Sequence, residues 1–112
     1  MEAITRILKL RSLDWEVDVP VRIFWPVEDK GSWFCRWEID WPDRKRSNMA
    51  GGVDGVQALR LALEMIGATL HYSDEHGAGA LRWNDGANDY GFPLPPCTRG
   101  GLSDAGDQPG LQ

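Results

Sequence analysis

The chain has 112 residues, 42% of them hydrophobic, and a formal net charge of −5. Its length predicts one domain, and its hydrophobic content suffices for a packed core without disulfide staples. The acidic balance disfavours nucleic-acid binding, and no run approaches the roughly 18 apolar residues of a membrane span. Because residues 1–13 contain no uninterrupted apolar leader and the only cysteines are Cys35 and Cys97, we expect a cytoplasmic protein.

Three stretches near the N-terminus alternate between apolar and polar residues, which is the two-residue period of a half-buried β-strand. Residues 4–10 alternate weakly, whereas residues 17–27 and 33–41 alternate strictly. The five residues between the two strict runs include Gly31, which accepts a positive φ, and are typical of a hairpin loop. We therefore expect the second and third strands to form a hairpin.

The register of this hairpin follows from its two faces. Pairing Val27 with Trp33 aligns the apolar sides of both strands in one continuous register and sets Arg22 opposite Glu38. Pro26 cannot donate a hydrogen bond to a ladder, so we expect an edge or a bulge beside it. The register assigns four tryptophans to the core face: Trp25, Trp33, Trp37 and Trp41.

The residues after Trp41 predict the rest of the sheet. Pro42 and Asp43 open a turn, in which we place the basic cluster of residues 44–46 as solvated surface. Residues 47–51 then return as a short fourth strand. Strands joined by such short loops form an antiparallel meander.

From about residue 55 the apolar period lengthens to three or four residues, which predicts an α-helix over residues 55–71. Asp54 is a suitable N-cap, and Gln57 three residues later completes a capping-box pattern. The apolar stripe that we expect to face the sheet contains Val56, Leu59, Leu63, Ile66 and Leu70.

One helix is too narrow to cover this sheet. Four strands at about 4.8 Å spacing span roughly 15–20 Å, whereas a helix is about 10 Å across. We therefore expect residues 80–94, which hold several large apolar side chains, to cross the uncovered part of the same face, with a short strand at residues 80–83. The alternative is that a second copy covers it, in a homodimer.

The predicted fold class is α+β: a four- to five-stranded antiparallel meander with one long α-helix, at about residues 55–71, packed on one sheet face. We assign this domain to residues 1–97. Residues 98–112 are rich in Gly, Ser, Asp and Pro and nearly devoid of large apolar side chains. They are predicted to be a disordered C-terminal tail.

Two polar segments invite a chemical interpretation. His71 and His76 flank Asp74 near the predicted end of the helix, but their spacing does not place both imidazoles on one helix face. The loop of residues 84–91 carries Asp85 and Asp89 without the ligand spacing of a calcium loop. We therefore predict no catalytic residue, no metal ligand and no cofactor.

Two tryptophans, Trp15 and Trp83, are not placed by the strand periodicity. Aromatic side chains are enriched in protein interfaces as well as in cores. We therefore name Trp15 and Trp83 as candidate contacts with a partner, together with Asp85 and Asp89 of the neighbouring loop.

A recurring pattern joins several of these features. The helix start has the form Gly-x-Asp-x-x-Gln-Ala-Leu, and the chain continues with Leu-Arg-Trp at residues 81–83 and Gly-Phe-Pro at residues 91–93. With the aromatic hairpin, residues 4–95 resemble a family of small uncharacterised bacterial domains. The resemblance implies the fold and a bacterial origin, but no activity and no site residues. The helix-start residues that match are Gly52, Asp54, Gln57, Ala58 and Leu59.

These patterns together predict a non-enzymatic binding or accessory domain that contacts another protein, for instance an immunity-like protein that neutralises a basic partner. A homodimer is left open, whereas nucleic acid and membrane are not expected as partners. The alternative is a small enzyme, or a ligand or metal binder, that uses His71 and His76 with Asp85 and Asp89. A pocket that joins these histidines to the acidic residues would favour the alternative.

Overall fold

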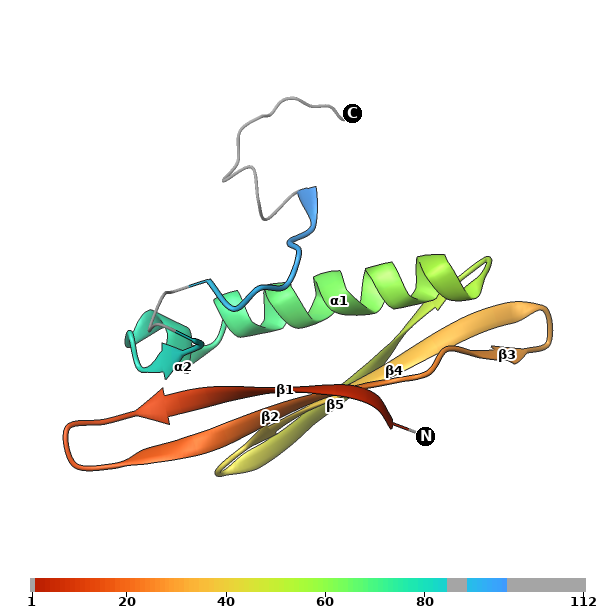
Figure 1. Cartoon of the computed structure of the whole chain (residues 1–112). Coiled ribbons are helices and arrows are strands. Elements are labelled where there is room, and N and C mark those ends of the chain that lie inside the picture. Colours follow the sequence, from red (N-terminus) through yellow and green to blue (C-terminus); the bar gives the residue numbers. More distant parts are fainter. Residues whose placement is uncertain (1, 85–88, 97–112) are drawn as a thin grey trace.

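The computed structural model describes residues 2–84 and 89–96, which form an antiparallel sheet with a helix lying across one face (Figure 1). Strands β2 and β3 pair one after the other with the same edge of β4, β5 pairs with the other edge of β4, and β1 and then β6 extend the sheet beyond β2. The predicted α+β class is confirmed. In chain order the elements are β1 (Glu2–Arg11), β2 (Glu16–Phe24), β3 (Val27–Asp29), β4 (Ser32–Trp41), β5 (Arg44–Gly52), α1 (Gly55–His71), α2 (Asp74–Gly77) and β6 (Leu81–Arg82).

The central hairpin has the predicted register in its middle but not near its turn. Arg22 of β2 lies opposite Glu38 of β4, as expected. Val27 of β3, however, lies opposite Phe34, one residue away from its predicted partner. The shift occurs where Pro26 separates β2 from β3, because a proline cannot donate a hydrogen bond to the ladder.

This shift corrects two further predictions. The connection is a two-residue turn at Lys30 and Gly31, with φ angles of 55° and 86°, and not a five-residue loop. Two positive φ angles match the twist of a tight hairpin. Trp25 is 60% exposed and not in the core, because it lies in the break between β2 and β3. Trp37 and Trp41 are buried as predicted, and Trp33 packs half-buried against them.

Strand β5 begins earlier than predicted. It pairs with β4 in one unbroken register, from Trp41 opposite Arg44 to Trp33 opposite Gly52. The basic residues 44–46 therefore belong to a strand and not to a turn. The long β4 offers backbone partners along its whole length, which outweighs the weak strand propensity of charged residues.

Helix α1 occupies the predicted residues and has the predicted cap. Asp54 Oδ1 accepts a hydrogen bond from the Gln57 N–H at 2.8 Å, and Gln57 Oε1 accepts one from the Val53 N–H at 2.8 Å. The buried stripe is rotated relative to the prediction, and Val56 is exposed. Two small residues in the stripe allow the helix to lie close to the sheet. Its fully buried members are Ala58, Ala62, Ile66 and Leu70.

The segment after α2 covers the part of the sheet that α1 leaves open. Strand β6 pairs with β1, and Leu81 and Tyr90 are fully buried in the core, with Phe92 packed against it. The chain then passes directly over α1, where a Cβ at Gly67 would lie only 2.3 Å from the Pro93 carbonyl oxygen. The structure thus shows cover of this face by residues 80–84 and 89–94.

In the described part of the chain, neither helix has the length and apolar character needed to cross a bilayer. Cys35 is buried as a free thiol, and its Sγ donates to the Phe24 carbonyl oxygen at 3.3 Å. Cys97 and the predicted tail of residues 98–112 lie outside the described residues.

Candidate functional site

The predicted contact residues lie in different surroundings. Trp15 is half exposed near the tip of the β1–β2 hairpin. Trp83 is packed within the fold, since the Arg6 guanidinium lies 4.2 Å from its ring centroid. Asp89 Oδ1 accepts a hydrogen bond from the Gly91 N–H at 2.9 Å, and Asp85 lies outside the described residues. Trp15 lines a hollow on the surface.

The two histidines meet, which the sequence analysis did not anticipate. Their ring centroids lie 4.7 Å apart, and His76 Nδ1 shares a hydrogen bond of 2.5 Å with the Tyr90 hydroxyl. They meet because Ser73 begins a second helix: its hydroxyl oxygen accepts from the His76 N–H at 3.1 Å. A serine cap followed by Asp74 and Glu75 was the sequence signal that could have revealed this turn.

This histidine cluster is part of the packing. Burial, and second the neighbouring His76, lower the pKa of His71, while burial raises the pKa of Tyr90. Tyr90 is almost fully buried and cannot reach a substrate in this conformation. Among the described residues there is no group of three or more His, Cys, Asp or Glu side chains placed to hold a metal ion.

A groove of about 680 Å³ lies between the β1–β2 hairpin and the α2–β6 segment; we call it the Trp15 groove. The hairpin tip extends past α2 in Figure 1. Its turn is closed by the Ser12 N–H, which donates to the Trp15 carbonyl oxygen at 2.8 Å, and Arg11 N–H donates to the Ala80 carbonyl oxygen at 2.9 Å. These bonds hold the hairpin at a set distance from α2. The lining of the groove includes Leu10, Leu13, Trp15 and Asp74.

Most charges at this groove are already paired. Arg11 contacts Glu16 at 2.9 Å, and Glu75 accepts two hydrogen bonds from Arg44, at 2.9 and 3.2 Å. That bidentate contact holds the pKa of Glu75 below its usual value. Asp74 makes no side-chain hydrogen bond or ion pair with any other described residue. Its carboxylate is therefore the charge that the groove can offer to a ligand.

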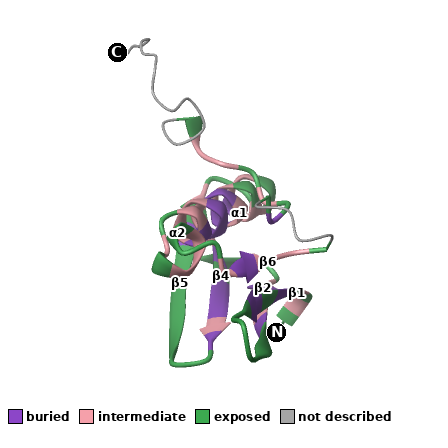
Figure 2. Ribbon diagram, turned by 90° about the vertical axis from the view of Figure 1, so that its left-hand side faces the viewer, coloured by how far each residue is buried: buried purple, intermediate pink, exposed green. Residues whose placement is uncertain are grey.

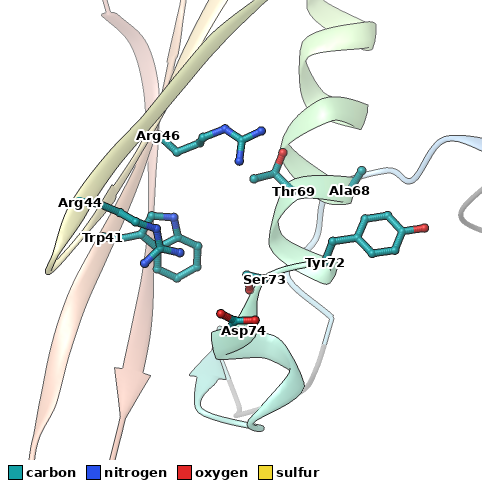
Figure 3. Close-up of a pocket in the computed structure, with 8 residues that line it drawn as sticks. All are labelled: Trp41, Arg44, Arg46, Ala68, Thr69, Tyr72, Ser73 and Asp74. Atoms are coloured by element: carbon teal, nitrogen blue, oxygen red, sulfur yellow. The ribbon is translucent and has the colours of Figure 1, made fainter.

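A second hollow, of about 360 Å³, lies on the other side of α2, between the end of α1 and strand β5 (Figure 3). We call it the arginine pocket. Arg44 and Arg46 reach into it from β5, and Arg46 points toward Thr69 of α1. The Arg44 guanidinium lies over the Trp41 ring, 4.6 Å from its centroid. Neither histidine lines this pocket or the Trp15 groove.

Comparison with known proteins identifies a family without an assigned activity. A family model described as "Domain of unknown function (DUF6968)" matches residues 4–94, nearly the range over which the resemblance was expected. No curated protein matches the chain, and no solved structure does.

Proposed function

We propose that this chain, which belongs to the family described as Domain of unknown function (DUF6968), is a non-enzymatic binding domain that holds a protein partner in the Trp15 groove. The family description carries no activity, so the proposal rests on the groove itself. The partner presents an apolar side chain together with a basic one.

The main support for the proposal is the apolar inner side of the β1–β2 hairpin, which extends beyond the part of the chain that covers it. Leu10 is 8% exposed, Trp15 51% and Leu13 102%, so exposure rises toward the tip. Single exposed apolar residues are ordinary, but neighbouring ones beside a groove mark interaction sites. Leu13 is fully exposed to solvent at the hairpin tip, so it has no packing role within the described chain.

The chemistry of the groove defines the kind of partner. Its volume falls within the range of ligand pockets and is enough for a leucine-sized or aromatic side chain. Asp74, whose carboxylate is unpaired among the described residues, provides a contact for a lysine or arginine. The net charge of −5 favours approach of a basic partner in the same way.

We place this interaction in the bacterial cytoplasm, where an immunity-like protein would neutralise a basic polypeptide. The bacterial origin rests on the sequence resemblance. A reduced and buried Cys35 is compatible with a reducing compartment. A groove of this size covers less than a standard protein interface, so the partner is held through a short segment or a transient contact.

The proposal is tested by photo-crosslinking in cells of the natural source. A photo-crosslinking amino acid replaces Leu13 at the groove, or Val27, which is 62% exposed on β3, as a matched control. We expect one defined crosslinked protein from position 13 and none from position 27, with loss of the product when Asp74→Asn is added. Absence of a product at position 13, or the same products from both positions, would refute the groove as the binding site.

A further inference from the structure

Strand β5 has an open edge that is ready to accept another strand. All nine of its residues pair with β4 in one register without a bulge, and its other edge pairs with no strand in the described part of the chain. Figure 2 shows β5 exposed at the margin of the sheet, beside the buried β4. Long, regular edges of this kind are usually protected by proline, bulges, covering loops or charged side chains, and β5 carries charges only in its first three residues. Residues 44–52 contain no proline.

The side chains along this edge carry a free positive charge. Arg46 lies opposite Ile39, which places it on the inner face of the sheet, toward α1. It makes no hydrogen bond or ion pair with other described residues, whereas Arg44 is held by Glu75 and by the Trp41 ring. Its neighbour Lys45 lies on the outer face and reaches Glu38 at 3.7 Å. Arg46 is thus the cation at the arginine pocket that has no charged partner within residues 2–84 and 89–96.

The side of α1 that faces this edge is amphipathic. Ala68, Thr69 and Tyr72 line the arginine pocket, and Leu61 and Met65 continue the same helical stripe at four-residue spacing. Leu61 and Met65 are half-buried against the core. A strand added to β5 would therefore direct alternate side chains first toward two arginines and then toward an apolar stripe.

We propose that the edge of β5 binds an acidic, extended peptide segment of another protein by strand addition. The backbone of the segment continues the sheet, an Asp or Glu side chain enters the arginine pocket and pairs with Arg46, and apolar side chains at the following alternate positions contact Leu61 and Met65. Guanidinium and carboxylate groups pair through two parallel hydrogen bonds, which gives this position its selectivity.

Charge decides between this occupant and a second copy of the chain. β5 holds three basic residues and no acidic one, so a β5–β5 pair would bring no carboxylate to Arg46. An acidic segment supplies it. This site adjoins the Trp15 groove, because Asp74 lines both hollows, but Arg46 lines the arginine pocket and not the groove.

The test uses blocked synthetic octapeptides with the alternating sequence Glu-Thr-Glu-Thr-Val-Thr-Leu-Thr and its reverse, since strand direction is free. Matched peptides carry Gln in place of Glu. We expect one of the Glu peptides to protect the backbone amides of residues 44–52 from hydrogen exchange. It should bind about tenfold more tightly than its Gln counterpart, the fold-change expected for one charged hydrogen-bonded pair.

The matched variants are Arg46→Glu and Lys45→Glu, which make the same change in net charge at neighbouring, exposed positions of one strand. Arg46→Glu should weaken binding about tenfold or more, and Lys45→Glu less than about threefold. Far-UV circular dichroism and the melting temperature check that both fold, and Arg46→Gln with Lys45→Gln replace them if either does not. Backbone pairing is checked with two peptides, one N-methylated at the odd-numbered residues and one at the even-numbered residues. The peptide whose methyl groups replace the N–H groups that face β5 should lose binding, and the other should keep it.

Three outcomes overturn the proposal. The first is no binding of either Glu peptide up to about millimolar concentration, where weak but specific strand addition would still be seen. The second is an equal loss for Arg46→Glu and Lys45→Glu, which would mean unspecific attraction. The third is protection of residues 44–52 that rises with the concentration of the chain alone, together with a dimer mass in sedimentation, which would assign this edge to a second copy.

Discussion

Gly67→Ala tests the cover that residues 89–94 provide over α1. A Cβ at this position would lie 2.3 Å from the Pro93 carbonyl oxygen and 3.2 Å from Leu94 Cδ2. Carbon–oxygen contacts normally need about 3.3–3.6 Å, so the covering segment must retreat by about 1 Å or detach. Inserting a methyl group into a packed contact costs about 1–3 kcal/mol, and the better helix propensity of alanine returns up to about 1 kcal/mol.

Detachment would cost more than this, because Tyr90 and Phe92 would lose burial worth about 1.5–3 kcal/mol for each large side chain. The net loss lies between about 0 and 3 kcal/mol, and we expect the free energy of unfolding of Gly67→Ala to fall by about 1–2 kcal/mol, where each kcal/mol is about 4–8 °C in melting temperature for a domain of this size. Urea denaturation followed by tryptophan fluorescence and circular dichroism measures the change.

The matched control is Gly77→Ala at the end of α2, where an added Cβ meets no atom within 4 Å. Its stability should stay within about 0.5 kcal/mol of the wild type. If Gly67→Ala were instead stabilised by about 1 kcal/mol, as expected for an open helix position, the packing of residues 89–94 on α1 would be refuted.

Three further predictions concern the core, the histidines and the hairpin turn. The folded state lowers the pKa of His71 below 6.5, so the unfolded chain binds the proton first as the pH falls, and the free energy of unfolding should decrease from about pH 7 to pH 5. His71→Gln should flatten this decrease in urea midpoints; an unchanged slope would count against it. Cys35 is buried, and burial raises its pKa. In a Cys97→Ser background, a thiol reagent should therefore label Cys35 only when the protein unfolds. Labelling of the folded protein at the rate of an exposed thiol would contradict this burial. Gly31→Ala should lower the free energy of unfolding by about 1–2 kcal/mol, the cost of a left-handed residue with a Cβ, whereas Lys30→Gly should not; equal melting temperatures for wild type and Gly31→Ala would refute the turn.

The parts of the fold that follow from local rules could be predicted from the sequence. The helix of residues 55–71 follows from its period and from the Asp54 cap, and both match the structure. The middle of the hairpin follows from two apolar faces that only one register aligns, which sets Arg22 opposite Glu38. Each of these depends on residues that are close in sequence or directly opposed.

The errors arose where two local rules compete or where a contact is distant. Pro26 breaks the ladder and shifts the register by one residue. Trp25 is therefore exposed to solvent, although the apolar–polar alternation of residues 17–27 assigns it to the core face. The helical stripe was centred on the largest side chains, but the sheet selects the small residues Ala58 and Ala62 for close approach.

The candidate sites were harder to predict than the fold. Trp15 was singled out because no periodicity placed it, but the groove beside it depends on α2 and β6, more than 55 residues away by sequence number. The arginine pocket was missed altogether. Arg44 and Arg46 were placed in a solvated turn, and only the pairing of β5 with β4 brings them onto the inner face beside α1.

The most direct test of the central claim is the affinity of the protein captured from position 13, measured by titration calorimetry against two tryptophan variants. Trp15 and Trp25 are exposed to similar extents, 51% and 60%, but only Trp15 lines the groove. We expect Trp15→Ala to weaken binding by about thirtyfold, the effect of a 2 kcal/mol interface hot spot, and Trp25→Ala to change it by less than about threefold. Equal losses for the two variants, or a larger loss for Trp25→Ala, would contradict the assignment of the Trp15 groove as the binding site.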